Sequence, residues 1–138
     1  MLRNLSLLRP FIYLMFLASC ATLVGTDFKV TDTMIGTGLE AASGNIVSVQ
    51  YTGWLYDEEK PNHRGRRFDM SEPGSPFTFQ LGAGRVIKGW EEGIPGMRVG
   101  GQRTLIIPSD MAYGSRGAGA TIPPDATLVF DIELIDVR

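Results

Sequence analysis

Apolar and polar residues alternate along several segments of this chain, and an alternation of period two predicts a strand with one buried face. The clearest case has Val47, Val49 and Tyr51 on one face, with polar residues between them. Segments of this kind, and short apolar runs bounded by glycine or proline, predict five strands, at residues 27–33, 46–53, 77–81, 102–107 and 127–134.

One segment has a helical spacing instead. Apolar side chains recur from Val86 to Ile94 at intervals that place them on one side of a helix, and charged residues occupy the opposite side. Glycine and proline at the end of the segment close it. Because an antiparallel sheet usually buries one face, this helix is its natural cover. The pattern predicts a single α+β domain with an antiparallel sheet and one short helix.

A polar run from Asp57 to Arg67 lies between the second strand and the next apolar segment. Acidic residues come first and basic residues last, and Pro61 and Gly65 favour a surface loop. Two interpretations stay open for this loop: a solvated bulge, or a contact loop for a client protein or the membrane surface.

The composition narrows the classes of function. The 138 residues suit one domain, and 17 glycines and 8 prolines favour a loop-rich β protein. Without its first 19 residues the chain has 11 basic and 15 acidic residues, which argues against nucleic acid as a partner. Cys20 and His63 are the only cysteine and histidine. An intrachain disulfide, a triad with histidine, a Cys/His pair and a histidine-based zinc site are therefore excluded. A metal site would need carboxylates alone, and we expect neither a metal nor a cofactor.

The beginning of the chain predicts an export signal. Residues 1–9 carry two arginines and no acid, and the apolar run at 11–18 is too short to span a bilayer. Leu-Ala-Ser then precedes Cys20, a pattern that resembles the bacterial lipobox, in which a lipid is attached to the cysteine and cleavage occurs just before it. We expect a signal peptide at residues 1–19, lipid attachment at Cys20 and a short tether at 20–26.

Two alternatives stay open for the leader. Cleavage after Ala21 would give a soluble periplasmic protein, and the leader could also stay uncleaved as an anchor. Lipidation would hold the protein on a membrane of the bacterial cell envelope, facing the periplasm, because buried acyl chains anchor stably. Ala21, which follows the cysteine in place of aspartate, favours the outer membrane if the organism is Gram-negative.

Short motifs follow one another along the rest of the chain. They are YTG at 51–53, FD at 68–69, PFTFQLG at 76–82, VIKGWEEG at 86–93, AYG at 112–114, IPP at 122–124 and ATLVFDIEL at 126–134. In this combination the chain resembles the FKBP-type peptidyl-prolyl cis-trans isomerases, the macrolide-binding immunophilins. The resemblance covers residues 27–138 and implies an FKBP-like curved antiparallel β-sheet wrapped around one short α-helix, with a ligand pocket between them. It also implies that residues 57–67 are an insertion.

The resemblance assigns roles to individual residues. Trp90 is similar to the pocket floor under a proline ring, and the walls are Tyr51, Phe68, Phe77, Val86, Ile87 and Phe130. Asp69 resembles a buried carboxylate that orients the ligand and pairs with Tyr51. Tyr113 resembles a flap tyrosine whose hydroxyl binds a substrate carbonyl, and the N–H of Ile87 would serve a second carbonyl.

The loop that would cover the pocket departs from the family pattern. Ile122 is similar to a flap residue that packs on the substrate, but Ala118 and Thr121 stand where bulkier groups are often found. Outside the pocket, we expect Phe79 to be mainly core. Three cations, Arg85, Lys88 and Arg98, are expected at the solvated surface.

The activity implied is acceleration of Xaa-Pro isomerisation in exported proteins, without a covalent step. The partners implied are proline-containing polypeptide clients and macrolide inhibitors of the FK506 or rapamycin type, and we expect a monomer. Two other classes stay open. The pocket could serve as a binding module for proline segments with turnover incidental, or the domain could be a structural spacer in an envelope lipoprotein.

Overall fold

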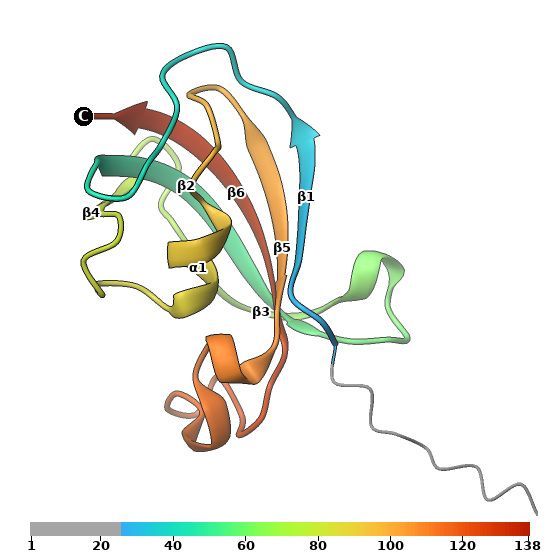
Figure 1. Ribbon diagram of the computed structural model, residues 1–138. Coiled ribbons are helices and arrows are strands. Elements are labelled where there is room, and N and C mark those ends of the chain that lie inside the picture. Colours follow the sequence, from blue (N-terminus) through green and yellow to red (C-terminus); the bar gives the residue numbers. More distant parts are fainter. Residues whose placement is uncertain (1–25) are drawn as a thin grey trace, which may run out of the picture.

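The computed structural model describes residues 26–138, and Figure 1 shows their path. The predicted signal peptide, Cys20 and all of the tether before Thr26 lie outside the described residues. The six strands are β1 (Lys29–Met34), β2 (Ile46–Tyr56), β3 (Arg64–Met70), β4 (Phe77–Gln80), β5 (Gln102–Ile107) and β6 (Leu128–Val137). The helices are α1 (Lys88–Gly93) and three single 3₁₀ turns, Pro61–His63, Ser109–Met111 and Gly114–Arg116.

All strand pairs are antiparallel, in the order β1-β5-β6-β2-β3, and β4 pairs with the first part of β2. The central pair, β2 and β6, extends from Val47 opposite Val137 to Leu55 opposite Leu128, with one shift of register between Ser48 and Val49. The sheet curves around α1, which lies against one face (Figure 1). The expected α+β fold, a curved antiparallel sheet around one short helix, is confirmed.

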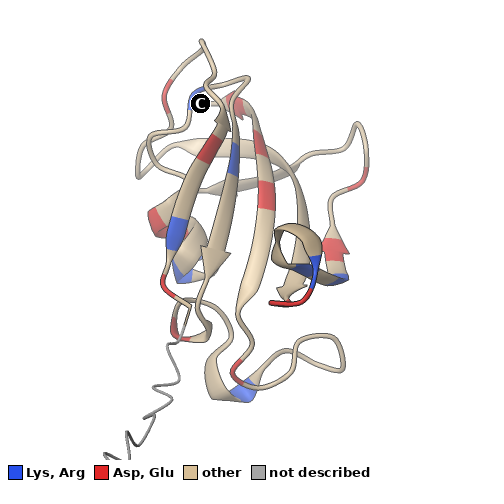
Figure 2. Ribbon diagram, turned by 90° about the vertical axis from the view of Figure 1, so that its right-hand side faces the viewer, with Lys and Arg blue, Asp and Glu red and all other residues tan. Residues whose placement is uncertain are grey.

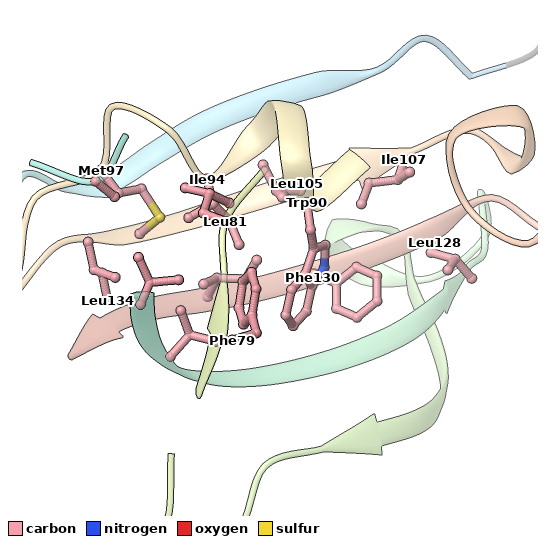
Figure 3. Close-up of a cluster of buried hydrophobic side chains, with 14 of the residues drawn as sticks. Phe79, Leu81, Trp90, Ile94, Met97, Leu105, Ile107, Leu128, Phe130 and Leu134 are labelled. Atoms are coloured by element: carbon pink, nitrogen blue, oxygen red, sulfur yellow. The ribbon is translucent and has the colours of Figure 1, made fainter. Parts of the chain in front are cut away.

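The core fills the space between α1 and the sheet (Figure 3). Val47 and Val49 of β2 are fully buried, and so is Leu134 of β6. The polar residues between them point to the other face, as the period of two requires. Figure 2 shows that this outer face carries acidic and basic residues interspersed along the strands.

Two glycines let α1 approach the sheet closely. A methyl group on Gly89 would come within 2.5 Å of Ile107, and one on Gly93 within 2.8 Å of Leu105. Both of these partners lie on β5 and are fully buried. Because the two glycines are four residues apart, they share one side of α1, and the helix backbone rests directly on β5.

Several boundaries differ from the sequence prediction: β2 continues beyond residue 53 to Tyr56, and β6 continues beyond residue 134 to Val137. Two further differences concern residues 57–67 and the helix. The loop expected at 57–67 is partly wrong, because strand β3 already begins at Arg64. This strand lacks apolar alternation and owes its conformation to pairing with β2. The helix is shorter than residues 86–94, since Ile87 has an extended ψ of 153° and is the residue before the first turn. Within residues 26–138, no helix has the length and apolar character needed to cross a bilayer.

Candidate active site: an aromatic pocket between helix and sheet

A pocket of about 230 Å³ opens between α1 and the concave face of the sheet. Its lining is mostly aromatic and aliphatic, and ten residues form it: Tyr51, Phe68, Asp69, Phe77, Arg85, Val86, Ile87, Trp90, Tyr113 and Phe130. A larger groove of about 500 Å³ lies on the outer face of the sheet, but it is more open, and its lining includes Gln50, Thr104 and Glu133. The concave-face pocket is the better candidate, because apolar walls with a few polar groups are typical of ligand sites.

Trp90 forms the floor of the pocket from α1. Only 4% of its surface is exposed. Its ring meets Tyr51 and Phe130 edge to face, with centroids 4.9 and 5.3 Å apart. The indole N–H is buried and has no hydrogen-bond partner among the described residues. Figure 3 shows the indole nitrogen beside Phe130, and the interplanar angle of 82° suits a contact between the N–H and the ring face.

A β-bulge brings two consecutive residues of β3 to the pocket. Gly53 of β2 pairs with Asp69, and the next residue, Trp54, pairs with Arg67. Strand β3 therefore has one extra residue, Phe68, at this point. Neighbours on a regular strand point to opposite faces, but a bulge re-aims a side chain. Phe68 and Asp69 therefore both line the pocket.

Tyr51 and Asp69 form the polar pair that the resemblance implied. The expectation of a buried carboxylate is wrong, because Asp69 lies on the edge strand β3 and is exposed. The Tyr51 hydroxyl donates a hydrogen bond of 2.7 Å to Oδ2 of Asp69. Burial raises the pKa of Tyr51 above its ordinary value, and the hydrogen bond and the negative charge of Asp69 raise it further. Tyr51 therefore stays a neutral donor throughout the physiological pH range.

Tyr113 reaches the pocket from the segment between β5 and β6. We call residues 109–125 the flap. The Tyr113 side chain lines the pocket while 40% of its surface remains exposed, and no hydrogen bond of its hydroxyl occurs within residues 26–138. Burial raises the pKa of Tyr113, and the charge of Asp69 adds to this effect. The protonated hydroxyl is thus free to donate to a ligand.

Nine of the ten pocket-forming residues predicted from the sequence meet in this lining, and Ile122 is the exception. It is 5% exposed and packs in the hydrophobic core beneath the flap. Its predicted contact with substrate therefore stays a prediction. The backbone N–H of Ile87, predicted as a donor, makes no hydrogen bond within the described chain.

Two charged residues have roles that sequence reasoning missed. Arg85 was expected at the solvated surface; it is exposed but also belongs to the pocket lining. Glu91 accepts hydrogen bonds from the backbone N–H of Gly82 and, at 3.1 Å, of Gly84. This carboxylate therefore holds the turn that leads to Arg85 and Val86. The helical pattern placed Glu91 on the polar side of α1, which does not reveal a backbone partner.

The chemistry of the lining favours binding and conformational catalysis. Its polar groups are one carboxylate, one guanidinium, two tyrosine hydroxyls and the free amide of Ile87. The carboxylate is already engaged by Tyr51. These groups suit the recognition of carbonyl oxygens around an apolar ring rather than the cleavage of a bond.

Comparison with known proteins agrees with this geometry. A family model described as FKBP-type peptidyl-prolyl cis-trans isomerase matches residues 38–135. An FK506-binding protein of Neisseria meningitidis serogroup A is 50% identical over 109 residues, which is 78% of this chain and 94% of the relative. FK506-binding protein 2 of Kluyveromyces lactis is 44% identical over 136 residues, or 98% of this chain and 91% of the relative.

Solved structures have the same fold. AtFKBP13 superposes with a TM-score of 0.68 at 41% identity, over 80% of this chain and 93% of that one. A peptidyl-prolyl cis-trans isomerase of Pseudomonas syringae pv. tomato gives 0.67 at 40% identity, over 80% and 75%. Sequence, fold and pocket thus lead to one conclusion: the chain belongs to the FKBP-type peptidyl-prolyl cis-trans isomerases.

Proposed function

We propose that this protein accelerates the cis-trans isomerisation of Xaa-Pro bonds in exported polypeptides while they fold. The observation that carries the proposal is the apolar pocket with Trp90 as its floor and polar groups only at its sides. Isomerisation of Xaa-Pro bonds is slow enough to limit folding, which makes a catalyst useful.

The barrier to rotation is about 18–20 kcal/mol because amide resonance must be broken. A catalyst therefore has to bind the twisted amide more tightly than either planar form. The twisted amide has less charge separation than the planar one, so an apolar pocket penalises it less. Every ~1.4 kcal/mol of this difference increases the rate tenfold.

The residues of the pocket divide this task. The proline ring would rest on Trp90, with Phe77 and Phe130 beside it. The free N–H of Ile87 and the hydroxyl of Tyr113 would each donate to a substrate carbonyl. Asp69 fixes the Tyr51 ring through the 2.7 Å hydrogen bond and adds a negative charge at the side of the pocket.

For location, we propose an envelope lipoprotein. The support is the sequence of the leader: a basic start, a short apolar run and Leu-Ala-Ser before Cys20. Residues 1–19 would be removed, Cys20 would carry the lipid, and residues 20–26 would tether the domain at 27–138. Incorporation of radiolabelled palmitate into the chain, and its loss in Cys20→Ala, would test this location independently of activity.

A protease-coupled assay on residues 21–138 tests the activity. Proline tetrapeptides that differ in the residue before proline should convert from cis to trans faster with the protein, and a macrolide of the FK506 type should block the acceleration. Asp69→Ala should lower the rate, and Asp27→Ala, which removes an exposed carboxylate outside the pocket lining, should not. A folded domain that binds the macrolide but gives no acceleration would contradict catalysis and favour a binding module.

A further inference from the structure

The tip of the flap is a small closed hairpin. We call residues 117–122 the flap tip. The N–H of Ala118 donates to the carbonyl of Ile122 at 2.9 Å, and the N–H of Ile122 donates to the carbonyl of Ala118 at 3.1 Å. The two bonds join the ends of the tip to each other, and Ile122 at one of these ends is buried.

A single arginine fastens this tip to the sheet. Nη2 of Arg66 donates a hydrogen bond of 2.8 Å to the carbonyl oxygen of Thr121. Among the hydrogen bonds within residues 26–138, it is the one that joins the flap to a segment distant in sequence. Without it, the flap would depend on its own internal bonds and on apolar packing, in which Ile122 is buried in the core and Met111, Ala112 and Ala118 pack against it.

Arg66 projects from a well-held part of the polar run at 57–67. The carboxylate of Asp131 on β6 accepts two hydrogen bonds from the neighbouring Arg64, at 2.5 and 3.2 Å. The same guanidinium lies 5.1 Å from the ring centre of Trp54, which adds a cation–π contact. Arg66 therefore has a fixed base from which its side chain can hold the flap.

The same strand forms the side of the pocket. Two and three residues beyond Arg66, Phe68 and Asp69 line it. The flap supplies Tyr113 to the same pocket. Strand β3 is thus hydrogen-bonded to the flap through Arg66 and forms part of the pocket wall through the residues that follow. This bond therefore positions the flap relative to that wall.

We propose that Arg66 is a positioning residue, which holds the flap tip through Thr121 and thereby keeps Tyr113 placed for substrate binding. The proposal rests on the isomerase function proposed above. It gives the polar run at 57–67 a role in the site: the end of this run reaches the flap rather than only the solvent. Thr121 is exposed, so the bond from Arg66 holds the part of the tip that the core does not cover.

The test compares Arg66→Ala, Arg66→Lys and Arg67→Ala in the full-length chain. Arg67 is the matched control, because it is exposed and has no hydrogen bond or ion pair of its side chain within the described chain. Amide hydrogen exchange at Ala118 and Ile122 should quicken in Arg66→Ala by about threefold to tenfold, the net worth of one ordinary intramolecular hydrogen bond. Arg66→Lys should restore part of the protection, and Arg67→Ala should match the unmodified protein.

A second readout uses a proline tetrapeptide. Arg66→Ala should raise KM by about threefold to tenfold and leave kcat within about twofold, because a loose flap weakens binding more than rotation. Equal exchange and equal KM in Arg66→Ala and Arg67→Ala would overturn the proposal, and so would a rise of KM with unchanged exchange at the tip. If the unmodified protein gives no acceleration, the proposed function fails, but exchange at the tip still decides whether Arg66 holds the flap.

Discussion

Replacing Gly89 by alanine would place a methyl group inside the side chain of Ile107. The new carbon would lie 2.5, 2.6 and 2.8 Å from three carbons of that isoleucine, all below the distance that real contacts allow. Ile107 is fully buried, so it has no free space to move into. Overpacking costs about 1–3 kcal/mol, and three such contacts favour the upper part of that range. Alanine regains about 1 kcal/mol over glycine within a helix. We therefore expect a net loss of about 1–2 kcal/mol.

The assay is thermal and urea unfolding of Gly89→Ala in two backgrounds, the unmodified chain and Ile107→Ala. Truncation of Ile107 removes all three clashing carbons, so in that background the same substitution should be neutral or stabilising. In the unmodified chain, Tm should fall by roughly 4 °C per kcal/mol for a domain of this size. Equal costs of Gly89→Ala in both backgrounds would refute the close-packing argument. Isomerase activity should fall as well, because Trp90 is the next residue and moves with the helix backbone.

Three further predictions concern the pocket. Asp69→Ala and Tyr51→Phe should each lower kcat/KM for a proline tetrapeptide by about tenfold, and the double variant should lose no more than either, since each breaks the same hydrogen bond. Arg85→Glu should lower kcat/KM about twofold to fivefold for peptides with an acidic residue beside proline, and raise kcat/KM for peptides with lysine there. Added salt should weaken both effects. Equal changes for both kinds of peptide would contradict the lining role of Arg85. Burial raises the pKa of both Tyr51 and Tyr113, so the stability tied to their protonated forms should be complete below about pH 10 and lost only above it. In a pH titration followed by tyrosinate absorbance, two tyrosines should ionise at higher pH than free tyrosine, and one of these two should be missing in Tyr51→Phe.

The alternating segments allowed five of the six strands to be predicted. A strand such as β6 buries Phe130, Ile132 and Leu134 on one face, and this need is visible in the sequence itself. Strand β3 was missed because its conformation depends on hydrogen bonds to β2, and the charged residues at its start are typical of a surface loop. Period-based reasoning fails where pairing, rather than burial, determines the backbone.

Most of the pocket was predictable because its residues stand in specific motifs. The motifs gave no reason why Phe68 and Asp69 should both reach the pocket, which requires the bulge in β3. The contacts of Arg66 with the flap and of Glu91 with the turn before α1 end on backbone atoms. Backbone N–H and C=O groups are the same for nearly all residue types, so the sequence does not indicate which of them a side chain will bind.

The order of the strands also determines when the domain can fold. Within residues 26–138, strand β1 pairs only with β5, and β2 has its longest pairing with β6, which comes last along the sequence. Early in synthesis, β2 can meet only β3 and β4, and its other edge stays open. Folding must then wait for distant segments, which for sheets dominated by such pairings takes roughly milliseconds to seconds. This delay leaves strand edges exposed to other chains until β6 arrives. For the exported protein proposed above, it would also keep the chain unfolded during translocation.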